Sequence, residues 1–319
     1  MLIPRYWSRA DSQATTPAGK RVHFHVWRGS RSDPAEAESL AREAVGRIAS
    51  RIERGEGFPE RYAYGDRPLR EEVIREFPGA TDAAPDAALT RNSYGALVLN
   101  AARLFFIDVD VPRPRPRPAA QQPSPVWALL DRLLGRPAAE ALPAPLRPVL
   151  EGILGPASAP ASAAAPADPA EAALERLRSW IAGHPDWRVR VYRTHSGLRY
   201  AVTHAPFGPT DAEAIAAMSA LGADPQYVRL CRAQKSFRAR LTPKPWRVGM
   251  ETPPVRFPYE GGEEGAMREW EARYARASEG FATCALLEEL GSGAEHPDAG
   301  PLLRLHDEHA RVGSGLPLA

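Results

Sequence analysis

The run from Arg103 to Val111, with the sequence RLFFIDVDV, is the most apolar part of the chain and ends in two carboxylates. β-branched and aromatic residues over such a length are typical of a β-strand. Side chains alternate between the faces of a strand, so Asp108 and Asp110 are expected to point the same way. Like charges repel and are costly to bury, and a divalent cation would remove that cost. The run therefore predicts a core strand carrying a candidate metal site; the alternative is that both carboxylates lie at an exposed strand end.

Composition places the chain among soluble globular proteins. Its 319 residues, 44% hydrophobic and 25% charged, suffice for one large domain or two smaller ones. No stretch approaches the apolar length of a membrane span, and the N-terminus lacks the apolar core of a signal peptide. Cys231 and Cys284 are the only cysteines, which excludes a disulfide framework and a four-cysteine zinc site. We therefore expect a cytoplasmic protein without a membrane partner.

The N-terminal part, residues 1–94, is predicted to be an α/β extension. After a polar and loose beginning, alternating residues from position 21 predict a strand that carries His23 and His25 on one face. A surface position is favoured over metal binding for these two histidines, because a third ligand is lacking. Asp33 followed by proline predicts the start of a helix that ends near Gly55.

The next stretch offers weaker patterns. A second short helix is predicted from Asp66 to Phe77, followed by a loop over 78–90. The short apolar segment 96–100 is expected to pair with the Asp-x-Asp strand as a hairpin. Residues 112–168 are rich in Pro, Ala, Arg and Ser, which predicts a largely flexible insertion, with a partner-binding arm as the alternative.

Residues 103–242 follow the order strand, helix, strand, strand, helix, strand. Besides the first strand, the predicted elements are a helix from Asp168, strands at 187–193 and 198–203 joined by a Ser196-Gly197 turn, a helix over 209–222 and a strand at 236–241. This order is that of a ferredoxin-like, or RNA-recognition-like, fold, with the first strand beside the third, both helices on one face and the other face open. The predicted class is therefore α/β (α+β), with a ferredoxin-like βαββαβ core over 95–247.

The C-terminal part, residues 248–319, is predicted to hold a long helix over 263–290 and a tail. The tail after Gly291 carries His296, His306 and His309 and is expected to be disordered.

Basic residues are segregated within the core. From Trp187 to Arg247 there are eleven Lys and Arg residues against three acidic residues, a local net charge of +8. On the predicted open face, arginines would surround the central carboxylates, an arrangement suited to a metal-bound polyphosphate. Anion or nucleic-acid binding is favoured over a merely solvated basic face.

The order of these motifs resembles the archaeo-eukaryotic primase superfamily, and within it the primase-polymerases. Phe105–Asp110 is similar to the family's strand-borne acidic pair, and Thr194–Arg199 (THSGLR) to its turn-and-strand motif, with Arg199 in place of the usual histidine. Asp224 is similar to the third acid, and the stretch after it to the family's triphosphate-holding segment. The run 227–246 is also similar to uncharacterised bacterial proteins.

The resemblance implies metal-dependent nucleotidyl transfer, template-directed or template-independent, with a nucleoside triphosphate as partner and, where there is a template, DNA or RNA. It implies Mg²⁺ or Mn²⁺ held by the catalytic residues Asp108, Asp110 and Asp224. It implies a triphosphate bound by Ser196, Arg199, Arg232, Arg238 and Lys244.

Three other functions stay open. The first is a non-catalytic nucleic-acid-binding module, in which Phe106 and Tyr192 would stack on bases. The second is a phosphoryl-transfer or hydrolytic enzyme acting on a small nucleotide. The third is a degenerate descendant without activity, which the arginine at position 199 favours.

Overall fold

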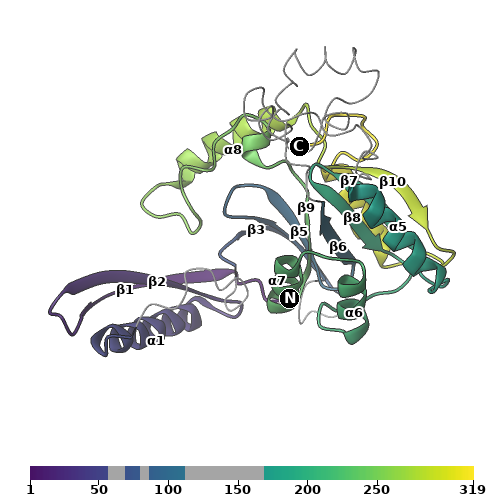
Figure 1. Cartoon of the computed structure of the whole chain (residues 1–319). Coiled ribbons are helices and arrows are strands. Elements are labelled where there is room, and N and C mark those ends of the chain that lie inside the picture. The colour runs from purple at the N-terminus through teal and green to yellow at the C-terminus, as the bar shows by residue number, and fades with distance from the viewer. Residues whose placement is uncertain (57–68, 80–85, 112–168) are drawn as a thin grey trace, which may run out of the picture. The chain divides into compact units, whose positions relative to one another are not determined.

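The computed structural model describes four stretches of the chain, namely residues 1–56, 69–79, 86–111 and 169–319. Contacts group Met1–Asp110 with Ala173–Ala319 in one unit and assign Val111–Ala172 to a second. The elements of the first unit are drawn in Figure 1. The predicted insertion at 112–168 and the start of the second predicted helix lie outside the described residues.

The Asp-x-Asp strand is present as β6 (Phe105–Asp110), and it lies at one edge of an antiparallel sheet. The strands of this sheet follow the spatial order β10 (Cys284–Leu290), β7 (Val189–Thr194), β8 (Gly197–Val202) and β6. The predicted hairpin is confirmed, because β7 pairs with β8 directly across the Ser196-Gly197 turn. The predicted pairing of the first strand with the third is confirmed as well, because β6 pairs with β8.

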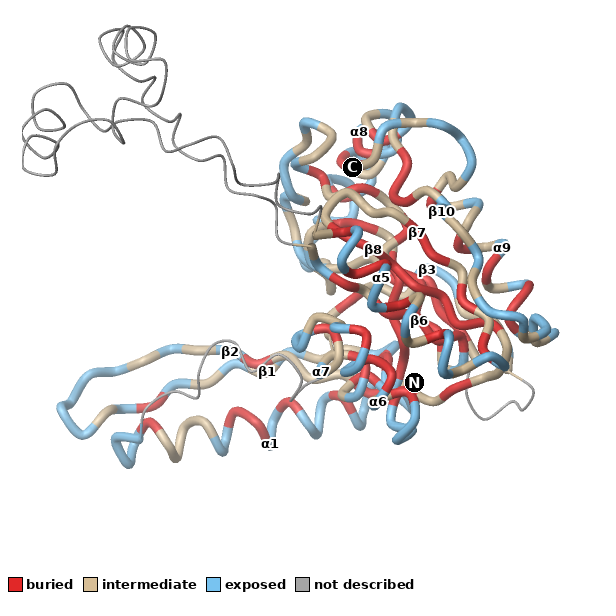
Figure 2. Tube along the Cα trace, turned by 45° about the vertical axis from the view of Figure 1, so that its right-hand side comes forward, coloured by how far each residue is buried: buried red, intermediate tan, exposed pale blue. Residues whose placement is uncertain are grey.

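Helices cover both faces of this sheet. On one face, α5 (Pro169–Ala182) buries Leu177, and the Tyr200 hydroxyl donates to the Ala173 carbonyl at 3.3 Å. On the other face lies α9 (Ala299–His309), whose His306 ring is 5.2 Å from the ring of Phe106. The prediction of an open sheet face is therefore wrong, and the buried strands in Figure 2 are enclosed on both sides.

A second antiparallel sheet contains the strands β3 (Glu72–Phe77), β4 (Ala87–Arg91), β5 (Leu97–Ala101) and β9 (Phe237–Arg240), in that order. Three expectations are corrected here. Residues 72–77 form a strand rather than a helix, residues 87–90 form a strand rather than a loop, and β5 pairs with β4 and β9 rather than with β6. For β4 and β5 the reason is burial, because both strands are covered on both faces and their apolar residues do not alternate with polar ones.

The mixed α/β class is confirmed, but the ferredoxin-like sheet is not. Its fourth strand, β9, pairs with β5 and not with β6. Contact between β9 and β6 is made instead by side chains, with the rings of Phe237 and Phe105 4.6 Å apart. The pairing of β4 with β5 also joins residues on either side of the predicted domain boundary at 94–95.

Two helices follow between β8 and β9. The first, α6 (Ala212–Ala220), confirms the predicted helix and buries Met218. The second, α7 (Pro225–Gln234), begins at Asp224, whose carboxylate accepts a hydrogen bond from the Gln226 N–H at 3.0 Å. Asp224 is thus the N-cap of α7, with proline at the first helical position.

The N-terminal elements are β1 (Tyr6–Thr15), β2 (Arg21–Ser30) and α1 (Pro34–Glu53), and β1 replaces the expected loose beginning. The predicted cap of α1 is confirmed, because the Asp33 carboxylate accepts from the Glu36 N–H at 2.8 Å. Helix α1 lies along the β1–β2 ribbon, as Figure 1 shows. Small and branched side chains, including Ala44 and Val45, pack between them. His23 and His25 are exposed on the opposite face of the ribbon.

The C-terminal part differs from the prediction in two places. The long helix ends early, as α8 (Glu264–Ser278), and residues 284–290 form β10. The sequence CALLEEL of β10 does not alternate, which explains why it resembles helix. The tail forms α9 instead of being disordered. None of the described helices combines the length and apolarity that crossing a membrane requires.

Candidate functional site

The site is centred on Asp108 and Arg199, which occupy paired positions on β6 and β8. The Asp108 carboxylate accepts from Arg199 Nε at 2.7 Å and from Arg199 Nη2 at 3.0 Å. The Arg199 side chain is only 2% exposed, whereas that of Asp108 is 33% exposed. Burial opposes the charge on Arg199, but Asp108 outweighs it and raises the arginine pKa. Arg199 is thus a permanently charged group fixed in a bidentate pair.

The remaining hydrogen-bond donors of Arg199 are used on the far side of its guanidinium. Nη1 donates to the Arg240 carbonyl at 2.9 Å and lies 3.3 Å from Nε2 of His306. Arginine has no acceptor, so Nε2 must accept, and the proton of the neutral imidazole is on Nδ1. That N–H then donates to Asp307 Oδ1 at 2.8 Å. Burial lowers the pKa of His306, consistent with a neutral ring.

Asp307 extends this network to β7. Its carboxylate accepts from the Tyr192 hydroxyl at 2.9 Å and from Arg190 Nη1 at 2.8 Å. Cys284 Sγ lies 3.9 Å from His306 Nε2, which gives a Cys-His-Asp arrangement. Both Cys284 and His306 are 0% exposed, and burial raises the thiol pKa to about 11. The arrangement is therefore structural, because a protonated and enclosed thiol cannot act as a nucleophile. Sequence reasoning missed this network because it rests on a tail expected to be disordered.

The other predicted acids come together at the exposed end of β6. Asp110 is the last residue of the strand, and the Asp224 backbone N–H donates to the Asp108 carbonyl at 3.1 Å. Burial raises the pKa of Asp110, and the negative charges of Asp224 and Asp108 raise it further. Lys244 acts in the opposite direction. We call Asp108, Asp110, Arg199, Asp224 and Lys244 the β6 site.

The three carboxylates of the β6 site do not fit the metal set that the family resemblance implies. Both oxygens of Asp108 are bound by Arg199, and Asp224 caps α7. Among the described residues, no group of three or more His, Cys, Asp or Glu side chains could hold a metal ion. Of the three carboxylates, only that of Asp110 makes no hydrogen bond or ion pair with a described residue, so the geometry supplies one available acid rather than three.

The residues predicted to bind a triphosphate are divided among three places. Ser196 and Lys244 join Arg199 near the end of β6, with Ser196 Oγ accepting from Arg247 Nη2 at 2.6 Å. Arg238 is buried elsewhere, where its Nη2 lies 2.7 Å and 3.0 Å from the Glu71 carboxylate oxygens. Arg232 is exposed on α7.

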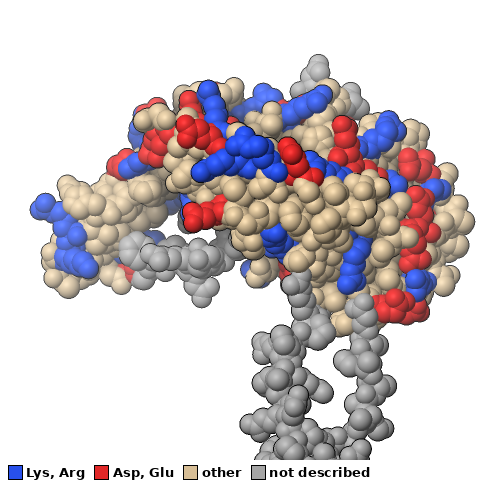
Figure 3. All heavy atoms as spheres, turned by 90° about the horizontal axis from the view of Figure 1, so that it is seen from above, with Lys and Arg blue, Asp and Glu red and all other residues tan. Residues whose placement is uncertain are grey.

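The basic stretch does not form a single positive face. Four of its arginines pair with carboxylates from outside the stretch, namely Arg188 with Glu289, Arg190 with Asp307, Arg199 with Asp108 and Arg238 with Glu71. Figure 3 shows basic and acidic side chains interspersed on the face that it presents. These four carboxylates neutralise half of the local charge of +8, which a count along the sequence cannot detect.

An exposed aromatic side chain accompanies the remaining cations. Trp246, in the short 3₁₀ turn Pro245–Arg247, is 54% exposed. Lys244 Nζ lies 5.5 Å from its ring centroid, and the Tyr94 ring meets it edge-on at 5.4 Å. Lys244 interacts electrostatically with Asp110, so the indole adjoins the β6 site. Sequence reasoning did not single out Trp246, because nothing in the sequence marks it as exposed.

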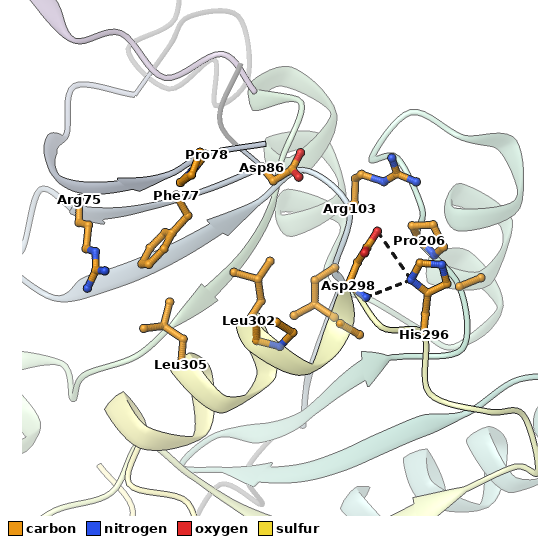
Figure 4. Close-up of a pocket in the computed structure, with 14 residues that line it drawn as sticks. Arg75, Phe77, Pro78, Asp86, Arg103, Pro206, His296, Asp298, Leu302 and Leu305 are labelled. Atoms are coloured by element: carbon orange, nitrogen blue, oxygen red, sulfur yellow. Dashed lines mark hydrogen bonds and ion pairs between the residues drawn. The ribbon is translucent and has the colours of Figure 1, made fainter. Parts of the chain in front are cut away.

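A separate cavity of about 380 Å³ lies between β3 and α9, as Figure 4 shows. Phe77, Leu302 and Leu305 form much of its apolar lining. Its rim carries both cations and carboxylates, and one carboxylate, Asp298, is 3.7 Å from the ring of His296. The mixed charges select no particular class of ligand.

Comparison with protein-family models, with curated proteins and with solved structures finds no match to this chain. The function must therefore be argued from the geometry of the site alone.

Proposed function

We propose that the protein binds nucleotides, free or within a single strand of nucleic acid, at the exposed end of β6. The observation that carries this proposal is Trp246, a half-exposed indole beside Lys244 and the β6 site. Exposed aromatic rings stack on bases, and neighbouring cations bind the phosphates. Lys244 and Arg247 supply those cations, although Arg247 already donates to Ser196.

Recognition at the strand end differs from that of an RNA-recognition module. Such a module stacks bases on the open face of its sheet, which would use Phe106 and Tyr192. Both rings are 0% exposed, because α9 covers that face. The binding surface that we propose therefore lies at the end of the sheet and not on its face.

Metal-dependent nucleotidyl transfer is the second candidate function, and Asp110 is the observation that favours it. Its pKa is raised by burial and by two neighbouring carboxylates, which is the situation that a bound Mg²⁺ or Mn²⁺ would relieve. Hydrolysis of a small nucleotide would use the same groups. Against both stands the engagement of Asp108 by Arg199, the residue at the family's histidine position.

The test is calorimetric titration of ATP and of a short single-stranded oligonucleotide, each with and without Mn²⁺. The Trp246→Ala variant should bind about tenfold more weakly, since one stacked base contributes about 1–3 kcal/mol. Tyr6→Ala is the matched control, because Tyr6 is an exposed aromatic residue on β1. Absence of binding by the wild type, or equal binding by the Trp246 variant, would overturn the proposal.

Comparing the titrations with and without Mn²⁺ separates the two candidate functions. If Mn²⁺ strengthens nucleotide binding and Asp110→Asn abolishes that effect, the catalytic candidate is favoured. If binding is independent of Mn²⁺ in both proteins, the non-catalytic candidate is favoured. Asp110→Asn suits this test better than a change at Asp108, which would leave Arg199 buried without its counter-charge.

A further inference from the structure

A second, smaller cavity of about 190 Å³ differs from the cavity between β3 and α9, because its lining combines several arginines with aromatic side chains. It lies where the start of β3 and the turn after β4 meet the loop 253–259 and α8. None of its lining residues belongs to the β6 site. The lining residues are Leu69, Arg70, Glu71, Arg91, Asn92, Ser93, Pro253, Val255, Arg256, Phe257, Tyr259 and Met267.

Two of the lining cations, Arg70 and Arg256, have no directly paired carboxylate among the described residues, although Glu260 attracts Arg70 without forming an ion pair with it. Neither guanidinium makes an ion pair or hydrogen bond with a side chain of the described stretches, whereas Arg91 is paired with Glu271 at 2.7 Å. Arg70 is half-buried, and its guanidinium carbon lies 5.4 Å from the ring centroid of Trp27. Burial lowers the pKa of Arg70, and the positive charge of Arg256 lowers it further. Glu260 offsets this effect only in part, so a bound anion would further stabilise these two neighbouring cations, one of which is half-buried.

Among the other polar side chains of this cavity, the amide and carboxylate acceptors are engaged. Asn92 Oδ1 accepts from the N–H groups of Tyr94 and Ala96, at 3.2 Å and 3.0 Å, so its amide nitrogen is left as a donor. The Ser93 side chain is exposed at the same turn. The carboxylate of Glu71 is already bound by Arg238 and by the Thr90 hydroxyl. The Ser93 hydroxyl can donate or accept, whereas the Asn92 amide and the guanidinium groups of Arg70 and Arg256 offer donors only, so the available groups favour an anion.

The apolar part of the lining indicates that the ligand also has an apolar or aromatic part. Phe257 and Tyr259 meet edge-on at 5.6 Å, and Met267 is buried beside them. The Tyr259 hydroxyl donates to Glu72 at 2.8 Å and so presents its ring, not its oxygen, to a ligand. An anion carried on an apolar or aromatic body matches both halves of the lining.

We propose that this cavity binds a phosphate monoester, with its phosphate between Arg70 and Arg256 and its organic body against Phe257 and Tyr259. Guanidinium groups bind phosphate through paired, charge-assisted hydrogen bonds, and a tetrahedral phosphate fits a small cavity. The Asn92 amide and the Ser93 hydroxyl supply further donors. The site is independent of nucleotide binding at the β6 site, with which it shares no residue.

The test is isothermal titration of the full chain with phenyl phosphate and with inorganic phosphate, using sodium chloride of equal ionic strength as the blank. Phenyl phosphate is expected to bind saturably, and the variants Arg70→Gln and Arg256→Gln should each bind about tenfold more weakly, because each loses a charge-assisted contact. Arg273→Gln is the matched control, since Arg273 is exposed on α8 and does not line the cavity.

The outcomes distinguish the source of the phosphate. Tighter binding of phenyl phosphate than of inorganic phosphate supports an organic monoester, and equal binding identifies free phosphate as the ligand of the same two arginines. Arg256 is exposed, so its variant tests the proposal even if Arg70→Gln fails to fold. Absence of saturable binding by the wild type, or unchanged binding by the Arg256 variant, overturns it.

Discussion

Asp108 and Arg199 face each other across β6 and β8, and both oxygens of the carboxylate are bound by the same guanidinium. The pair joins a one-third exposed acid to an almost fully buried base. Arg199 continues inward to His306, so the pair is the outer end of a buried network and not an isolated surface contact. Because of this position, we expect substitutions of Asp108 or Arg199 to affect the stability of the protein.

Removing Asp108 should destabilise the protein more than removing Asp110. Asp108→Ala leaves Arg199 buried without a counter-charge, and we expect a loss of about 3 kcal/mol in the free energy of unfolding. Asp110→Asn, at the exposed strand end, should change it by less than about 0.5 kcal/mol. Urea denaturation of both variants measures the difference.

A double variant tests whether the Asp108 effect is one of charge. Asp108→Leu combined with Arg199→Met removes both charges, and it should recover most of the stability that either single change loses. If the losses of the two single variants simply add, the two side chains are not coupled and the buried-pair interpretation fails.

His306 should make the stability depend on pH in a defined window. The pKa of His306 in the folded protein lies below the ordinary value of 6.5. Just below pH 6.5 the unfolded chain therefore binds a proton at this histidine, whereas the folded chain does not. Stability should therefore be complete above pH 6.5 and fall as the pH drops below it, by at most about 1.4 kcal/mol per pH unit. Asp307, whose pKa is lowered from 3.8, contributes only at more acidic pH.

The measurement is urea denaturation at several pH values between 5 and 8. In His306→Gln, which cannot titrate, the slope over this window should flatten, whatever the loss in absolute stability. His309→Gln is the control, because His309 lies on the same helix and hydrogen-bonds to the Leu305 carbonyl rather than to the buried network. An unchanged slope in the His306 variant would show that another group is responsible.

Strands whose sequences alternate between apolar and polar residues could be predicted. Strands whose position depends on pairing with residues distant in the sequence could not. The sequences of β7 and β8 alternate between apolar and mostly polar residues and are joined by a short turn, so local rules suffice even though both faces of the hairpin are covered. β4 and β5 are buried on both faces and have no alternation, and β10 is held by pairs such as Arg188 with Glu289. Local sequence carries no information about such a partner.

The candidate site shows the same limit. The common direction of Asp108 and Arg199 followed from strand periodicity, whereas the covering of that face by α9 did not. The presence of Lys244 near Asp110 could be expected from the family resemblance. The burial of Arg238 could not, because its partner Glu71 lies 167 residues away in the sequence.

Arg238 should therefore behave as a structural residue rather than as a phosphate ligand. Its side chain is 9% exposed and that of Glu71 is 6% exposed. Arg238→Met leaves Glu71 buried without a counter-charge and should cost about 3–5 kcal/mol of stability. The affinity of the remaining folded protein for ATP should be unchanged in calorimetry. If Arg238→Met instead loses much of its affinity for ATP while its stability is unchanged, Arg238 is a ligand of the nucleotide.

Asp224 has two candidate roles, as the N-cap of α7 and as an acid of the β6 site, and two substitutions separate them. Asp224→Ser removes the charge but keeps a side-chain oxygen for the Gln226 N–H, so stability should change by less than about 0.5 kcal/mol. Asp224→Ala removes both and should cost about 1 kcal/mol. If Asp224 also holds a cation with Asp110, both variants should lose any Mn²⁺-dependent binding of ATP to the same extent. If its role is only that of a cap, binding should be unaffected in Asp224→Ser, and the two variants should differ in stability alone.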